Sequence, residues 1–358
     1  MKLNKESIKE LRNCLEEELE NYKGKEHIKL NIDSELLRNI LLEDIDIGGY
    51  FVIPFNLVKK LDLTDFSFDG IDIVRKDFTG SKGVVINPQT VLDKDMDFTC
   101  LNNTTIEGSF DDVDIDGTDF TGSKGAVINP QTISQKNLHG TILDDVTIEG
   151  SFDGVCIEST NFTGSKGAII DPQTIYKKNM KGTVLSDVTF DGSFDGVDIR
   201  WANFKGSKGA VIDPQAIYDK DMNKTVLTDT TIEGTFDGVD IRGTNFTGSK
   251  GAVINPQEIY DKDMSFTKLT DTTIDGSFDV VYIRGTDFTG SKGAVINLQK
   301  IYDRIAIGTI FTDATVEGTV ENVKIDEEGL KQIQQILEKE EEKVKKLKKE
   351  IRKSFKNS

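Results

Sequence analysis

The chain has 358 residues, of which 36% are hydrophobic and only 8% are aromatic. Its formal net charge is −18, and the segment 51–325 alone carries 42 acidic and 26 basic side chains. A surface this acidic argues against direct contact with nucleic acid or with anionic membrane, and it favours a partner with a basic groove.

The cysteines and the first residues predict a compartment. Cys14, Cys100 and Cys156 lie far apart and form no CxxC pair, and an odd, dispersed set argues against a disulfide framework. Residues 1–20 are charged throughout, and no apolar run approaches ~18 residues. We therefore expect a cytoplasmic protein with no secretion signal and no membrane span.

The first expected domain, residues 1–62, is a helical cap with a lead-in to the next domain. Residues 6–22 predict an amphipathic helix, because their large apolar side chains fall on one stripe. That stripe consists of Ile8, Leu11, Leu15 and Leu19. A second short helix is expected at 34–42, with Asp33 or Ser34 as its cap. Residues 50–63 then lead into the repeats.

The second expected domain, residues 63–325, is a tandem repeat. The tetrapeptide Gly-Ser-Lys-Gly begins at Gly80 and recurs every 42 residues as far as Gly290. A fixed period of this size indicates stacked units of one supersecondary structure. Within one unit, large apolar residues recur about every five positions, at Ile254, Ile259, Met264, Leu269, Ile274, Phe278, Ile283 and Phe288.

A period of five fits neither the 3.6-residue period of an α-helix nor the two-residue period of a flat strand. It fits a chain that turns a corner after each short side and points one apolar residue inward from that side. Four sides make a coil of ~20 residues, so each unit is two coils, and the eight apolar residues form inward ladders stacked from coil to coil.

The pentads resemble those of the pentapeptide-repeat family, in which a small residue and Asp or Asn precede Leu or Phe and two polar residues follow. Thr244-Asn245-Phe246-Thr247-Gly248 and Val239-Asp240-Ile241-Arg242-Gly243 show the pattern. The resemblance implies an all-β solenoid, a right-handed quadrilateral β-helix. With α-helical caps at both ends, this is the fold class we expect, in a bacterial protein.

Two features depart from a plain pentad repeat. The extra Ser-Lys-Gly always falls at one corner, which predicts a row of aligned loops carrying Lys82, Lys124, Lys166, Lys208, Lys250 and Lys292. The stretch Asn255-Pro256-Gln257 puts a glutamine, and later Lys262, where a coil prefers small inward residues. Because Asn-Pro also starts helices, this side is expected to be either a straight edge or a helical turn.

The third expected domain, residues 326–358, is a charged amphipathic helix. Its apolar residues on heptad a and d positions, interrupted by Glu340, are Leu330, Ile333, Leu337, Val344, Leu347 and Ile351. Two uses of this stripe remain open. The helix either caps the last coil, or forms a seam that makes the protein a homodimer.

No residue pattern predicts catalysis, a cofactor or a metal site. His27 and His139 lack a ligand set, and the calcium-like run Asp112-x-Asp114-x-Asp116 has Ser123 where a calcium loop requires glutamate. Gly-Ser-Lys-Gly lacks the longer phosphate-loop pattern. One binding alternative is an extended anion held along the row of Gly-Ser-Lys-Gly loops.

The leading functional hypothesis is therefore a non-enzymatic, protein-binding scaffold with an unknown protein partner. A scaffold of this kind needs an external aromatic stripe, and the candidates are Tyr176, Tyr218, Tyr260 and Tyr302. The alternative is a DNA mimic, which the resemblance brings in because quinolone-resistance members of the family are thought to occupy the DNA groove of gyrase. A mimic needs one uninterrupted acidic face.

Overall fold

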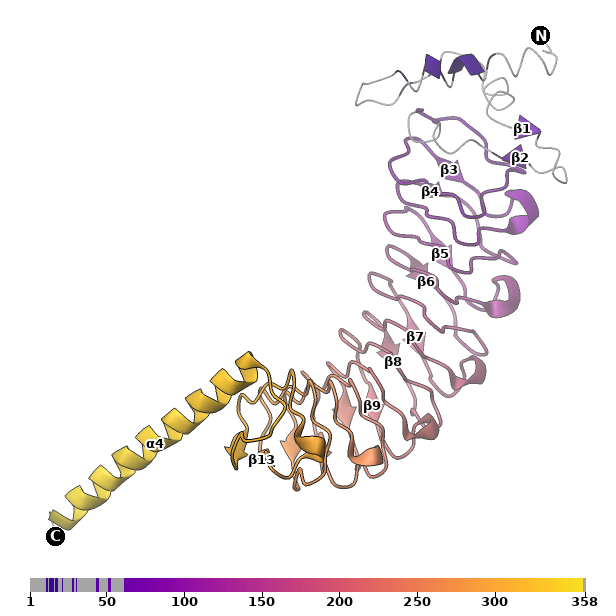
Figure 1. The fold of residues 1–358 in the computed structure, drawn as a ribbon. Helices are drawn as coiled ribbons and strands as arrows, with labels where there is room; N and C mark the ends of the chain where they lie inside the picture. Colours follow the sequence, from indigo (N-terminus) through magenta and orange to yellow (C-terminus); the bar gives the residue numbers. More distant parts are fainter. Residues whose placement is uncertain are drawn as a thin grey trace. The chain divides into compact units, whose positions relative to one another are not determined.

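The computed structural model describes residues 61–356 and, before them, residues 11, 13–15, 17, 18, 21, 28, 30, 43, 44, 51 and 52. The chain winds into a β-solenoid of about 12 turns, with short parallel strands and one C-terminal helix (Figure 1). The predicted solenoid is thereby confirmed. The chain divides into two compact units, Met1–Gly192 and Ser193–Ser358.

Described residues between 11 and 21 are helical, and the expected helix at 34–42 lies outside the described residues. The strands of the first unit are β1 (Glu43–Asp44), β2 (Phe51–Val52), β3 (Val85–Ile86), β4 (Thr105–Ile106), β5 (Val127–Ile128), β6 (Thr147–Ile148), β7 (Ile169–Ile170) and β8 (Thr189–Phe190). β1 and β2 pair antiparallel, whereas β3 pairs with β4, β5 with β6 and β7 with β8 in parallel.

The strands of the second unit are β9 (Val211–Ile212), β10 (Thr231–Ile232), β11 (Val253–Ile254), β12 (Thr273–Ile274), β13 (Val295–Asn297) and β14 (Thr315–Glu317), followed by helix α4 (Glu327–Lys356). Single 3₁₀ turns occur at η1 (Leu92–Lys94), η2 (Ser134–Lys136), η3 (Tyr176–Lys178), η4 (Tyr218–Lys220), η5 (Tyr260–Lys262) and η6 (Tyr302–Arg304). Within this unit too, strands pair in parallel between neighbouring coils.

Backbone bonds between coils follow the five-residue rhythm of the sequence. On one side β11 pairs with β12, with Val253 opposite Thr273. On two further sides, isolated parallel bridges join Asp263 to Tyr282 and Lys268 to Asp287. On the remaining side the Tyr260 amide donates to the Val239 carbonyl at 3.1 Å. Each coil therefore hydrogen bonds to its neighbour along all four sides.

The core lies inside the coils. The eight apolar residues of the unit that runs from Ile254 to Phe288 are all buried, and Phe278 meets Phe288 edge to face across the interior, with ring centroids 5.4 Å apart. Buried threonines fill the spaces between them. The Thr244 hydroxyl donates to the Met222 carbonyl at 2.7 Å, and the Thr267 hydroxyl donates to the Ile241 carbonyl at 2.9 Å. Inward polar groups thus add coil-to-coil bonds.

The outward Asp or Asn of a pentad closes the corner that follows it. The Asn245 side-chain oxygen accepts the Thr247 amide at 3.0 Å, and the Asp287 carboxylate accepts the Thr289 amide at 2.9 Å. Such Asx turns satisfy a backbone donor that would otherwise face solvent at the bend. The pentad therefore encodes both an inward apolar residue and a local turn.

The Asn-Pro-Gln side is not a straight edge but holds a single 3₁₀ turn, which does not start at the proline. Asn255 makes an Asx turn, and the single 3₁₀ turn η5 begins four residues after Pro256 and contains Asp261 at φ 49°. The Gln257 side chain reaches the next coil, donating to the carbonyls of Ser277 and Asp279 at 2.9 Å each.

The neighbouring Lys262 donates to the Gln257 side-chain oxygen at 2.7 Å, which fixes the orientation of the amide. Gln89, Gln131, Gln215 and Gln299 make the same pair of bonds to carbonyls 20 and 22 residues further on. The glutamine that seemed misplaced in a plain coil is therefore a brace between coils.

The Ser-Lys-Gly insertion is not a projecting loop. Lys292 pairs with Thr273 in a parallel bridge, and its amide donates to the Thr272 carbonyl at 3.0 Å, so the segment is part of the coil wall. The chain then bends at Gly293, where φ is 81° and a Cβ atom would lie 2.7 Å from the Ile274 carbonyl oxygen. Only glycine fits there. The extra residues lengthen one side of the coil.

Helix α4 closes the last coil. The Asp326 carboxylate accepts the Gly329 amide at 2.8 Å and the Gly308 amide at 2.7 Å, which joins the start of the helix to a coil corner. These bonds stabilise the charged form and lower the pKa of Asp326. Ile333 is buried, and Gln332 accepts the Phe311 amide at 2.9 Å. The first turns of α4 therefore act as the predicted cap.

We expect Phe246→Asp to unfold the coils around it. The substitution removes a fully buried ring, which alone costs about 3–5 kcal/mol, and places a carboxylate among apolar side chains. The matched control is Thr247→Asp, one position further on and exposed, which should change stability by about 0.5 kcal/mol or less. Thermal unfolding followed by circular dichroism measures both, and equal melting temperatures would show that Phe246 is not a core residue.

Candidate protein-binding face

The four tyrosines of the expected stripe occupy one position of the coil. The amides of Tyr176, Tyr218, Tyr260 and Tyr302 each donate to a valine carbonyl 21 residues earlier, at 3.0–3.1 Å. Tyr176, in the first unit, and Tyr218 and Tyr260, in the second, are about half exposed. Tyr302 is more buried because its ring stacks on Tyr282, with centroids 3.7 Å apart. Three of the four therefore offer an aromatic surface.

Arginines accompany the tyrosines of the second unit. Arg200 and Arg242 each point back to the aspartate two residues before them. The Arg200 Nε donates to Asp198 at 2.9 Å, and the Arg242 Nε donates to Asp240 at 2.9 Å. These charge-assisted bonds raise the pKa of both guanidinium groups. The guanidinium of Arg200 also lies 5.8 Å from the ring centroid of Tyr218.

Two further cations of this unit rest on exposed aromatic rings. The Lys224 ammonium lies 4.4 Å from the centroid of Trp201, and the Arg284 guanidinium lies 5.9 Å from the centroid of Phe266. The ring of Phe266 sits over Gly285, where a Cβ atom would approach within 2.6 Å of it. Trp201 is 55% exposed and Phe266 is 60% exposed, so both rings face solvent.

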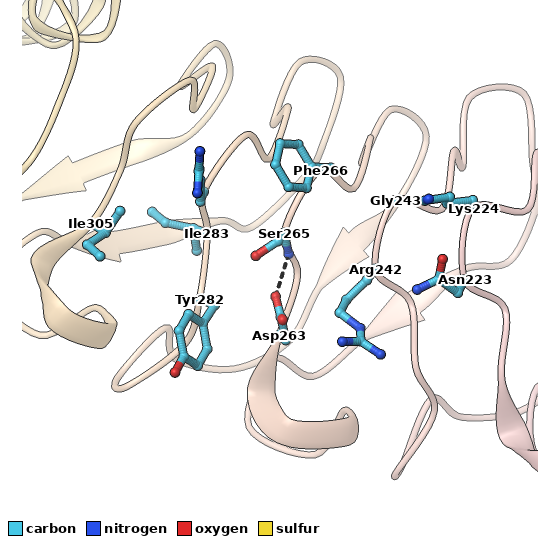
Figure 2. Close-up of a pocket in the computed structure, with 11 residues that line it drawn as sticks. Asn223, Lys224, Arg242, Gly243, Asp263, Ser265, Phe266, Tyr282, Ile283 and Ile305 are labelled. Carbon is cyan, nitrogen blue, oxygen red and sulfur yellow. Dashed lines mark hydrogen bonds between the residues drawn. The ribbon is translucent and has the colours of Figure 1, made fainter.

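Tyr282 lies on the same surface as Lys224, Phe266 and Arg284. Its hydroxyl interacts with that of Tyr302, and this hydrogen bond is the largest cause that raises the pKa of Tyr282 to about 12. In Figure 2 Tyr282, Phe266, Arg242 and Lys224 lie along one wall of consecutive coils, and the Ser265 amide donates to Asp263 at 2.8 Å between them. The outcome is a surface of aromatic rings and cations on an otherwise acidic chain.

The arginines, Trp201, Phe266 and Tyr282 were not among the residues singled out from the sequence. The signal is present but needs the 42-residue register. At the position of Arg242 the second unit has Arg200 and Arg284, whereas the first has Val74, Asp116 and Glu158. Positions where the repeat changes residue type while the coil stays the same mark a face that differs from unit to unit.

The lysines of the expected loop row are all exposed, and Lys82 pairs with Asp62 at 2.8 Å. The amides of the motif are used inside the protein. Gly290 donates to Asp313 at 2.8 Å, Ser291 to Phe288 and Lys292 to Thr272, and the motifs that begin at Gly122, Gly164 and Gly248 repeat all three bonds. An anion held by the backbone would have to displace them, so the motif is better explained as structural.

The residues of the expected dimer seam fall into two groups. Leu330 is half-buried and Ile333 is buried against the last coil, whereas Leu337, Val344 and Leu347 are exposed along α4. The side chain of Ile351 lies outside the described part of the chain. The stripe thus serves as a cap at its start and leaves apolar side chains exposed further along the helix.

Within the part of the chain that the structure describes, the remaining candidate groups form no recognisable site. His139 pairs with Asp116 at 3.1 Å, and His27 lies outside the described residues. Within the described ranges, no three His, Cys, Asp or Glu side chains are placed to bind a metal ion. In the same ranges, no helix is long and apolar enough to cross a membrane.

A cluster of carboxylates in the first unit departs from ordinary titration. Partial burial is the main cause that raises the pKa of Asp97 to about 7, and a hydrogen bond with Asp114 and the charge of that residue add to it. Burial also raises the pKa of Asp95. Asp97 therefore takes up a proton on folding, near pH 4–7, that the unfolded chain does not hold.

We expect the first unit to become less stable as pH rises, because Asp97 then loses this proton. A carboxyl group whose folded pKa lies above its unfolded pKa stabilises the fold at low pH, and the contribution is lost as pH rises toward 7. Asp97→Asn should therefore melt higher than the wild type at pH 8, with a smaller difference at pH 5. Asp112→Asn, at an exposed corner, controls for net charge. An equal gain for Asp97→Asn at both values would contradict the assignment.

No protein-family model matches the sequence, and no curated protein matches it. Among solved structures, a trypsin-treated variant of QnrB1, described as a plasmid-mediated fluoroquinolone resistance protein, aligns over 72% of this chain and 96% of its own, at 13% identity and a TM-score of 0.20. The assignment of the fold therefore rests on the observed coils and not on this match. The fold is a β-solenoid, consistent with a pentapeptide-repeat protein.

Proposed function

We propose that the protein is a non-enzymatic scaffold that binds another protein through the outward aromatic and arginine side chains of its second unit. The observation that carries the proposal is the exposure of Tyr218, Tyr260, Trp201 and Phe266 on the coil wall. Aromatic residues and arginine are enriched in the contact surfaces of protein complexes, where they contribute most of the binding energy. Isolated exposed apolar residues need no explanation, but a repeated set does.

The test is site-specific photo-crosslinking in the native host. A benzophenone amino acid placed at Tyr218 or Tyr260 should form a covalent adduct with one defined protein, identified by mass spectrometry. The same amino acid at Lys208 or Lys250, exposed positions in the insertion of the same unit, should give none. Adducts of equal yield at all four positions, or no adduct at the tyrosines, would refute this face as the contact surface.

The DNA mimic remains the second candidate because of one observation. Glu233, Asp275 and Glu317 recur every 42 residues in the second unit, and all three are exposed. Its test is inhibition of gyrase supercoiling by the purified protein at two salt concentrations. A mimic inhibits at low protein concentration and weakens as salt screens the charges. The scaffold proposal predicts no inhibition, since cations and aromatic rings interrupt the acidic surface.

We also propose that α4 pairs with α4 of a second copy. Leu337, Val344 and Leu347 are exposed at a and d positions, which leaves an apolar seam uncovered. The flanking charges favour an antiparallel pair. A parallel pair would bring Lys343 against Lys348 of the partner subunit, whereas an antiparallel pair brings Glu341 against Lys348 of the partner subunit.

Light scattering tests the pairing. The wild type should have twice the chain mass of 39.7 kDa, and Val344→Asp with Leu347→Asp should halve it without lowering the melting temperature of the coils. Orientation is tested in a Cys14→Ser background by mixing Val344→Cys with Leu347→Cys. An antiparallel pair gives the mixed disulfide, whereas a parallel pair links Val344→Cys to itself. A monomeric wild type would end the proposal.

A further inference from the structure

A groove runs along the coil wall of the second unit. Its volume is about 720 Å³. Residues that line it include Lys224, Arg242, Asp263, Phe266, Tyr282 and Arg284. Figure 2 shows these side chains contributed by successive coils, with Ile305 at one end and Asn223 and Lys224 at the other. The groove is therefore elongated across several coils.

The cations of the groove differ in how they are compensated. Arg242 is paired with Asp240, which neutralises it. Arg284 and Lys224 have no carboxylate within ion-pair distance among the described residues, and each lies instead over an aromatic ring. A cation on a ring keeps most of its charge available to a ligand. The groove thus offers two positive charges to an incoming group.

Phe266 is costly for the fold. Its φ is 61°, in the left-handed region that favours glycine, and its ring is mostly in water. Three of the equivalent positions, Gly140, Gly182 and Gly308, carry glycine at the same kind of corner, whereas Phe98 and Lys224 are also at positive φ. The backbone there is the same, because the amides of Gly140 and Phe266 each donate to the carbonyl 18 residues further on, at 3.2 and 2.9 Å.

A coil with glycine at position 266 would therefore be at least as stable as the wild-type coil. The same holds for Trp201, which has φ 64° where the equivalent residue of the next repeat is Gly243. Gly285 leaves room for the ring of Phe266 to lie flat on the wall. An exposed aromatic ring that the fold does not need, held under a cation at a position suited to glycine and lining a groove, is best explained by a ligand.

Resting on the proposed scaffold function, we propose that this groove binds an acidic peptide segment of the partner protein, with a carboxylate on Arg284 and an aromatic or aliphatic side chain packed on Phe266. A polyanion fits less well. A single nucleic-acid strand places a phosphate at every nucleotide, and Asp221, Asp240 and Asp263 line the same wall of a chain with net charge −18. A peptide can place one carboxylate and one ring without facing those aspartates.

The experiment uses the full-length protein and fluorescence anisotropy of labelled peptides. The probes are a short peptide of alternating glutamate and phenylalanine, the same peptide with glutamine for glutamate, and an oligothymidylate strand. We expect the acidic peptide to bind, and the glutamine version to bind at least about tenfold more weakly. Phe266→Gly and Arg284→Gln should each weaken binding about tenfold.

Stability separates a binding role from a structural one. Phe266→Gly should melt at or above the wild-type temperature, because glycine relieves the backbone. Phe98→Gly is the matched control. Phe98 is the equivalent residue of the first unit, also at positive φ and also under an arginine, and its removal should leave peptide binding unchanged.

Three results would overturn the inference. These are no binding of the acidic peptide up to about 1 mM, equal binding by Phe266→Gly, or tighter binding of the oligonucleotide at the same residues. If Tyr260 crosslinks to a partner protein but the acidic peptide does not bind, the groove proposal fails and the scaffold proposal stands. If the acidic peptide binds but Tyr260 gives no crosslink, the groove proposal stands and the broader contact face is refuted.

Discussion

The hydrogen bond from one coil to the next is the interaction on which the rest of the structure depends. In the described coils the strands pair with a neighbouring coil and not within the same coil, so the backbone groups must be satisfied by the coils before and after. The Lys268 amide donates back to Thr244, while the adjacent Leu269 amide donates forward to Asp287, both at 2.9 Å. Leaving one such group buried and unpaired would cost about 1–3 kcal/mol, and each coil carries several of them.

This constraint divides the sequence into positions that build the coil and positions that do not. Inward apolar residues, threonines such as Thr267, the Asx corners and the Gln257 brace all serve the stacking. Other outward side chains, including those at the turns, have no such role. Asp116 and Glu158 in one unit therefore give way to Arg242 in the other while the backbone bonds persist. Binding properties can change from repeat to repeat without changing the fold.

The five-residue rhythm predicted the solenoid, because the spacing of Ile254, Ile259 and Met264 reports directly which side chains face inward. Bonds between residues about 20 positions apart could not be predicted in this way. Gln257 looked misplaced because its carbonyl partners, Ser277 and Asp279, belong to the next coil. Lys292 looked like a loop residue because its bridge to Thr273 depends on the bend at Gly293. The Phe266 site became visible only once the coils were in register.

The most direct test of this division compares thermal unfolding of two variants, one altered outside and one inside. The outer variant carries Trp201→Ser and Phe266→Gly, the residues found at equivalent positions, Ser159 and Gly182, of the other unit. The inner variant carries Phe288→Ala, which should lose about 3–5 kcal/mol. The account predicts wild-type melting for the outer variant and a clear fall for the inner one. A fall of similar size in both would show that the outer face is part of what holds the coils together.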